Sequence, residues 1–154
     1  MPGPSATGRI VVEASPEKVY ALVSDPGSLA GLAEEYAGYR WLGDAKAAAV
    51  GARFRGSNRR GLRRWSTVST VTDAEVGRRF GFEVTFVGLP VARWQYDIEP
   101  DGVGSAVTES TWDRRARWLK VPTALGTGVW QRDETNHENI AATLHRLKDA
   151  VERV

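Results

Sequence analysis

The chain contains no cysteine and only two histidines among its 154 residues. The absence of cysteine excludes disulfides and thiolate chemistry. The two histidines, His137 and His145, lie eight residues apart with no cysteine to complete a set of ligands, a pattern that argues against a zinc site. We therefore expect neither a metal nor any other cofactor.

Long apolar runs are also missing. No stretch approaches the ~18 consecutive apolar residues that a membrane-spanning helix needs, and the N-terminal Met-Pro-Gly-Pro-Ser segment lacks the apolar centre of a signal peptide. We expect residues 1–8 to form a flexible leader and residues 9–154 to form a single domain, because a chain of this length supports one core. A cytoplasmic location is the default expectation.

An excess of charge of one sign is absent too, since 21 basic residues face 19 acidic ones and the formal net charge is +2. Arginines at 53, 55, 59, 60, 63 and 64 form one basic hairpin, in which alternation places Arg53 and Arg55 opposite Phe54 and in solvent. Nucleic-acid binding requires a wider basic surface with stacking aromatics beside it. We therefore expect no nucleic-acid partner.

Familiar catalytic and cofactor motifs are not found. The sequence has no G-x-S-x-G and no evident Ser–His–acid set. Gly126-Thr-Gly128 lacks the third glycine and the preceding strand of a dinucleotide fingerprint. These two glycines are more typical of a bend or of a close approach between a helix and a sheet.

The N-terminal third has an informative order of elements. Ile10 and Val12 alternate with Val11 and Glu13 as in a strand, and Ser15 and Pro16 then form an N-cap and first turn. The helix that follows has an apolar stripe of Val19, Leu22 and Val23. Asp25-Pro26 repeats the cap and proline, which predicts a second short helix.

Strand-like runs fill the middle of the chain, and one helix closes it. Strands are predicted from residue 39 and over 51–58, 62–72, 79–86, 91–99 and 105–113. Their short connections predict antiparallel pairing. Helical spacing then appears at Ile140, Leu144, Leu147 and Val151. The pattern predicts an α+β fold in which a curved sheet of six or seven antiparallel strands wraps around the long C-terminal helix.

Several segments carry a resemblance to a known family. Ala14-Ser-Pro-Glu-Lys-Val-Tyr20 with Ser24-Asp-Pro26 resembles the opening of bacterial polyketide cyclase/dehydrase-type proteins, which belong to the START-like, birch-pollen-allergen-like (SRPBCC) superfamily. Further similar segments are Arg64–Thr72, Gly77–Phe80, Trp94–Pro100, Val107–Ser110 and Thr143–Lys148. The resemblance covers nearly the whole chain.

This resemblance implies a helix-grip fold and a single START-like domain that holds a small molecule between sheet and helix. Members of the superfamily bind lipids, hormones or polyketides, and some cyclise or dehydrate them. Some protect antibiotic producers by binding the reactive product. The resemblance therefore implies a hydrophobic small-molecule ligand, and a fold alone does not choose among these activities.

The lining of such a cavity can be predicted from strand alternation. If Trp94, Tyr96 and Ile98 point inward, Phe80, Phe82, Val84 and Phe86 do too, and an inward Trp65 brings two polar side chains, Thr67 and Ser69, to the same wall. The alternative is that the aromatics simply fill the core. The candidate ligand-binding residues are Trp41, Trp65, Thr67, Ser69, Phe82, Trp94, Asp133 and Asn136.

Glu109 is the candidate acid–base residue. It shares one face of the last strand with Val107 and Thr111, so an inward Val107 places Glu109 inside, where desolvation raises a carboxyl pKa. In the alternative, Trp112 points inward and Glu109 lies in solvent.

His137 lies about one turn before Ile140, near the edge of the apolar stripe, and Asp133 and Asn136 fall on that stripe. Polar residues there indicate a helix end that faces a cavity, where His137 could carry protons. Alternatively, His137 is a hydrogen-bonded residue at a helix edge and this end of the helix protrudes.

Two functions remain open at this point. In the first, the protein carries, senses or sequesters a polyketide- or lipid-like natural product, which includes self-resistance to an antibiotic. In the second, it is a polyketide cyclase or dehydratase in which Glu109 or His137 moves the proton and Tyr96 donates a hydrogen bond to the developing enolate. The sequence does not identify an oligomeric state.

Overall fold

The computed structural model describes residues 3–32, 36–60, 62–115 and 132–153. The strands are β1 (Ala6–Val12), β2 (Tyr36–Trp41), β3 (Arg53–Arg60), β4 (Arg63–Glu75), β5 (Arg79–Phe86), β6 (Leu89–Asp101) and β7 (Gly104–Asp113). The helices are α1 (Pro16–Val23), α2 (Pro26–Leu32) and α4 (Arg132–Glu152). Gly126 and Gly128, which we expected at a bend, lie outside the described residues.

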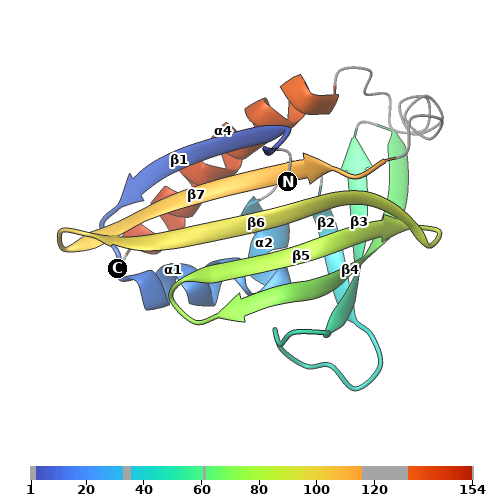
Figure 1. Ribbon diagram of the computed structural model, residues 1–154, viewed down its shortest axis with the longest axis horizontal. Helices are drawn as coiled ribbons and strands as arrows, with labels where there is room; N and C mark the ends of the chain where they lie inside the picture. Colours follow the sequence, from blue (N-terminus) through green and yellow to red (C-terminus); the bar gives the residue numbers. More distant parts are fainter. Residues whose placement is uncertain (1–2, 33–35, 61, 116–131, 154) are drawn as a thin grey trace.

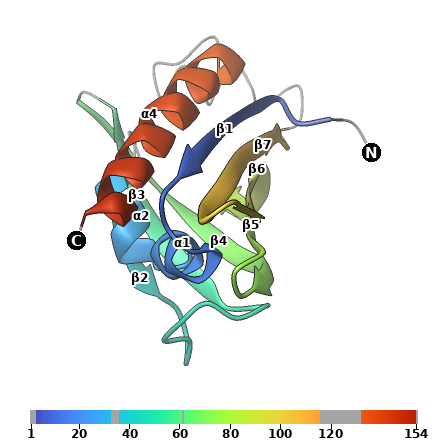
Figure 2. The same cartoon turned by 90° about the vertical axis from the view of Figure 1, so that its left-hand side faces the viewer.

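The seven strands form one antiparallel sheet in the order β1-β7-β6-β5-β4-β3-β2 (Figure 1). Consecutive strands from β2 to β7 are neighbours, and β1 pairs with the last strand. The described helices lie on one side of the sheet, with α4 packed along β1 (Figure 2). The predicted α+β helix-grip architecture is confirmed, with seven strands.

The start of α1 follows from its cap. The Ser15 hydroxyl accepts a hydrogen bond from the Lys18 backbone N–H at 3.2 Å, and Pro16 begins the helix, where a missing N–H costs nothing. Val19, Tyr20 and Val23 are the buried residues of α1. Asp25 plays the same part for α2, since its carboxylate accepts the Gly27 N–H at 3.2 Å.

β1 begins earlier than the sequence analysis placed it. Ala6, Thr7 and Gly8, which we expected in the leader, pair with Thr111, Ser110 and Glu109 of β7. Their small and polar side chains hide the strand signal. Gly8 has a packing role, because a Cβ there would lie 2.7 Å from Cγ2 of Ile140 on α4. A missing side chain thus lets the helix approach the sheet.

The core lies between the concave face of the sheet and the helices. Four residues of α4 are buried at helical spacing, as predicted: Ile140, Leu144, Leu147 and Val151. Register shifts in β4 between Val71 and Asp73, and in β5 between Val84 and Thr85, interrupt the regular pairing. Such bulges bend a sheet. None of the described helices is long and apolar enough to cross a membrane.

A methyl group added at Gly8 tests the close approach of α4. We expect Gly8→Ala to lower the free energy of unfolding by about 1–3 kcal/mol, because the new Cβ meets Ile140 at 2.7 Å. The loss should shrink when Ile140 is also replaced by alanine, and a double-mutant cycle in urea measures this coupling. Gly3→Ala is the control, since nothing lies within 4 Å of its added Cβ. Equal effects at Gly3 and Gly8 would contradict the packing role.

Candidate functional site

Glu109 and Tyr96 lie side by side on the concave face of the sheet. β7 and β6 pair so that Glu109 is directly opposite Tyr96, and both side chains are only 3% exposed. Val107 and Thr111, two residues before and after Glu109, are fully buried. The inward orientation of Glu109 is therefore confirmed, whereas Trp112 lies half-buried beneath the guanidinium of Arg93, 5.9 Å from its ring centre.

A hydrogen bond joins this pair. The Tyr96 hydroxyl donates to Oε2 of Glu109 at 2.7 Å. Oε1 of the same carboxyl is buried and has no hydrogen-bond partner among the described residues. Buried polar atoms are nearly always paired, and one that is not costs ~1–3 kcal/mol. An exception of this kind calls for an explanation, and function is one.

Burial changes the protonation of both groups. Desolvation raises the pKa of Glu109 from 4.5 to about 8, although the Tyr96 hydrogen bond acts in the opposite direction. The pKa of Tyr96 is raised well above 10.0, first by burial and then by the negative charge of ionised Glu109. At neutral pH Glu109 is therefore mostly protonated. Because Oε2 accepts the Tyr96 proton, the carboxyl proton lies on Oε1, where it forms an unused donor.

Helix α4 packs along β1, the strand that pairs with β7 beside Glu109. Gly8 is opposite Glu109 on the other side, and the space over Gly8 is filled by Ile140 and Leu144. Asn136, one turn before Ile140, is 6% exposed. The predicted polar residue on the inner stripe of α4 is therefore buried, as expected. The backbone of Asp133 belongs to α4, but its side chain lies outside the described residues.

His137 has a different position from its neighbour. Its side chain is exposed, whereas Asn136 is buried. One residue along a helix rotates a side chain by about 100°, so only one of these two neighbours faces the core. The exposure of His137 gives no support to its predicted part in proton transfer inside the protein.

Aromatic side chains form a row across the concave face. The distance between ring centroids is 5.4 Å for Trp41 and Phe54, 5.7 Å for Phe54 and Phe82, and 5.7 Å for Phe82 and Phe80. Phe54 and Phe80 are fully buried and fill the core. Trp41, Trp65, Phe82 and Trp94 are only partly buried. These four residues are the part of the aromatic row that stays partly exposed, and their predicted contact with a ligand stays a prediction.

Polar side chains accompany the aromatic row. Thr67 and Ser69 are 9% and 3% exposed, which confirms that they point inward. Asn58 joins them, because its amide donates to the Thr67 hydroxyl at 3.2 Å. We did not predict Asn58, although alternation from Phe54 through Gly56 places it on the same face. The alternation was visible in the sequence, but the arginines on both sides of Asn58 drew attention to the solvent-facing side of the strand instead.

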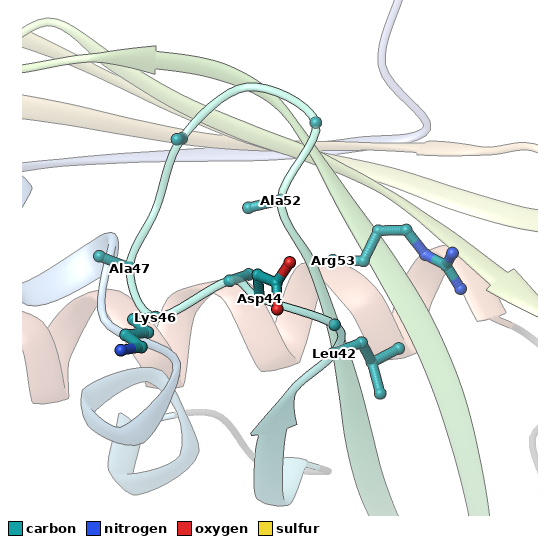
Figure 3. A pocket seen from close by; sticks show the side chains of 10 residues that line it. Leu42, Asp44, Lys46, Ala47, Ala52 and Arg53 are labelled. Atoms are coloured by element: carbon teal, nitrogen blue, oxygen red, sulfur yellow. The ribbon is translucent and has the colours of Figure 1, made fainter.

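A surface pocket lies away from Glu109 and Tyr96. A hollow of about 500 Å³ is formed by the connection between β2 and β3 and is lined by residues such as Leu42, Asp44, Lys46 and Arg53 (Figure 3). Neither Glu109 nor Tyr96 lines it. The cavity expected between the sheet and α4 stays a prediction. Within the described ranges, no group of three or more His, Cys, Asp or Glu side chains could hold a metal ion.

Comparison with known proteins identifies the family. Residues 4–152 match the family of polyketide cyclases/dehydrases and lipid transport proteins. The chain belongs to this family. The match spans almost the whole domain, including β1, the Glu109–Tyr96 pair and α4. No curated protein matches the chain.

Solved structures of similar fold include both single-domain and two-domain proteins. A Polyketide_cyc-like protein of Corynebacterium glutamicum is 28% identical with a TM-score of 0.60, over 99% of this chain and 96% of the other. A protein of Chromobacterium violaceum is 19% identical with a TM-score of 0.73, over 100% of both chains. A di-domain ARO/CYC protein of the steffimycin biosynthetic pathway is 11% identical with a TM-score of 0.71, over 95% of this chain and 49% of the other.

The protonation of Glu109 predicts how the stability of this family member depends on pH. The folded protein keeps a proton up to about pH 8 that the unfolded chain loses near pH 4.5, so stability should fall as the pH rises between these values. At about 1.4 kcal/mol per pKa unit, the loss amounts to several kcal/mol. Glu109→Gln removes this titrating group. Its free energy of unfolding, measured in urea, should therefore exceed that of the wild type above about pH 8.

Glu138→Gln is the matched control, because Glu138 is an exposed carboxyl on α4. It should leave the pH dependence of the wild type unchanged. A Glu109→Gln variant whose stability follows the same pH curve as the wild type would show that Glu109 is not the group that titrates.

Proposed function

We propose that the protein binds a hydrophobic small molecule of the polyketide- or lipid-like class on the concave face of its sheet, for carriage, sensing or sequestration. The observation that carries the proposal is the buried carboxyl of Glu109, whose Oε1 has no partner among the described residues. A ligand oxygen, such as a carbonyl, would accept the proton of Oε1 and remove the cost of an unpaired donor. Sequestration of a reactive product, and with it self-resistance, is one form of this function.

The half-buried aromatics support the same proposal. Trp41, Phe82 and Trp94 offer apolar surface beside a small number of polar groups, a composition typical of small-molecule sites. Thr67 and Ser69 would fix the orientation of the ligand further along the wall. Family membership adds support, because the family includes lipid transport proteins.

A second function, cyclisation or dehydration of a polyketide-like substrate, is favoured by one observation. The pKa of Glu109 lies at about 8, close to the value at which a carboxyl can both give and take a proton at neutral pH. Ionised Glu109 would remove a proton from a carbon next to a carbonyl. The enolate carbon would then bond to a second carbonyl carbon, whose oxygen takes up the proton, and loss of water would follow.

For Tyr96 we propose a different role from hydrogen-bond donation to an enolate. Its hydroxyl proton is donated to Glu109 at 2.7 Å, so donation to a developing enolate would require that bond to break. In both functions we therefore assign Tyr96 as a positioning residue, which holds Oε2 and leaves Oε1 for the ligand.

Substitutions at Glu109 separate binding from catalysis. Glutamine keeps an N–H donor at this position, so Glu109→Gln should retain ligand affinity. Glu109→Leu should weaken binding by roughly tenfold, because one hydrogen bond contributes about 1 kcal/mol or more. The assay incubates the protein with a panel of polyketide-like and aromatic natural products and analyses retained ligands and products by liquid chromatography and mass spectrometry.

The outcomes of this assay are distinct. A ligand retained and recovered intact establishes binding, whereas a product that has lost water, or an isomer of unchanged mass, establishes the enzyme. In the enzyme, Glu109→Gln should abolish turnover and keep affinity. Trp94→Ala should weaken binding in both cases, and Glu99→Gln, an exposed carboxyl on β6, is the control. Unchanged affinity in both Glu109→Leu and Trp94→Ala would contradict the proposed site.

A further inference from the structure

Two hairpin tips at one end of the sheet expose apolar side chains. Leu62 lies between β3 and β4 and is 101% exposed, while Val87 and Leu89 lie at the β5–β6 turn and are 84% and 36% exposed. The pairing of Val68 with Thr85 places both tips at the same end of the sheet. In Figure 1 the β3–β4 tip lies at the upper right and the β5–β6 turn lies below it at the right-hand edge. Exposed apolar residues at one end of a protein mark a candidate interaction site.

Val87 has an unfavourable backbone for its residue type. Its φ is 51°, and it is the one residue other than glycine with a positive φ in the described ranges. Gly88 follows with a φ of 77°, so the pair forms a tight turn in which Asn, Asp or Gly is the usual first residue. A β-branched residue is strained there. An exposed valine in this conformation is therefore a candidate for contact with something outside the chain.

Several arginines on β2, β3 and β4 have no acidic side chain nearby, among the described residues, to balance their charge. Arg59 is directly opposite Arg64, and Arg40 is directly opposite Arg55, although like charges facing each other destabilise a sheet. Together with Arg63 these side chains are exposed, and within the described part of the chain none of the five forms an ion pair. No Asp or Glu occurs in residues 53–72 or 84–96.

Arginines elsewhere on the outer face of the sheet, by contrast, form ion pairs. Arg93 contacts Asp73 at 2.6 Å and Glu83 at 3.5 Å, and Arg79 contacts Asp97 at 2.7 Å. Arginines in the middle of the sheet are therefore neutralised by neighbours, whereas Arg59, Arg63 and Arg64 near the β3–β4 tip form no ion pair with any described residue. An uncompensated basic cluster fits an anionic partner.

We propose that this end of the molecule docks on the surface of an anionic lipid membrane, with Leu62, Val87 and Leu89 inserted among the headgroups and Arg59, Arg63 and Arg64 on lipid phosphates. The apolar residues stand on separate projections, which suit a deformable headgroup layer better than the flat surface of a protein. Combined apolar insertion and basic charge is also how peripheral proteins bind membranes. The proposal goes beyond ligand binding, which needs no membrane.

The proposed membrane-binding end lies next to the partly exposed aromatic residues of the concave face. Trp65, on the concave side of β4, is only three residues from Leu62, and Trp94 lies five residues from Leu89 along β6. The half-buried part of the aromatic wall therefore lies toward the end of the sheet that would face the membrane. A hydrophobic ligand could pass between lipid and protein with little exposure to water.

Sedimentation of the full-length protein with vesicles tests this proposal. We expect binding to vesicles of an equimolar mixture of phosphatidylcholine and phosphatidylglycerol, and much weaker binding to phosphatidylcholine alone. Raising the salt from about 0.1 M to about 1 M, which shortens the Debye length from about 10 Å to about 3 Å, should release most of the protein. No binding to the anionic vesicles at low salt would overturn the proposal.

Variants locate the contact. Val87→Asn should raise the melting temperature, because Asn tolerates the positive φ, and should still lower the vesicle partition coefficient. Leu62→Ser should lower that coefficient roughly tenfold by removing an inserted apolar side chain. Arg59→Gln and Arg64→Gln should each lower it about fivefold.

Matched controls come from the opposite end of the sheet. Val103, 100% exposed in the β6–β7 turn, and Arg78, exposed in the β4–β5 turn, are replaced as Val103→Ser and Arg78→Gln. Both should bind like the wild type. Equal losses in the controls and the tip variants would contradict a localised surface. Tip-dependent binding to duplex DNA with none to vesicles would assign the surface to nucleic acid and overturn the proposal.

Discussion

The hydrogen bond between Tyr96 and Glu109 is the interaction on which the chemistry of this protein depends. It joins two neighbouring strands at 2.7 Å in the interior, where each side chain is only 3% exposed. Burial keeps Glu109 protonated at neutral pH, and the Tyr96 hydroxyl occupies only one of its two carboxyl oxygens. The remaining oxygen is a polar group inside the core that the rest of the described chain does not satisfy. Both proposed functions use this one atom.

The fold contributes to these conditions by packing α4 closely against β1. Gly8, opposite Glu109 on β1, has no side chain, so Ile140 of α4 can occupy the space above it. Close packing excludes water, and the exclusion of water raises the carboxyl pKa. At the other side of the sheet, aromatic rings that are only partly buried extend the same concave face toward the β3–β4 and β5–β6 tips. The molecule thus has a buried polar pair and a more exposed apolar wall on one face of the sheet.

Much of this arrangement could be predicted from the sequence, and the failures have physical reasons. Period-two alternation limited Glu109, Thr67 and Ser69 to one of two faces each, and their burial in the structure shows that it is the inner one. The contact between Glu109 and Tyr96 could not be predicted, since it depends on the register of two strands. Local propensity also missed Ala6–Gly8, whose strand character comes entirely from pairing with β7. His137 faces solvent because one residue along a helix changes the face by about 100°.

The protonation state of Glu109 is the central claim, and direct titration of its carboxyl carbon tests it most closely. The measurement follows the ¹³C chemical shift of the side-chain carboxyl by NMR as a function of pH, with the Glu109→Gln variant to assign the resonance. The account predicts a single transition at about pH 8. A transition near the ordinary value of 4.5 would show that Glu109 is ionised at neutral pH and would contradict the account of the site.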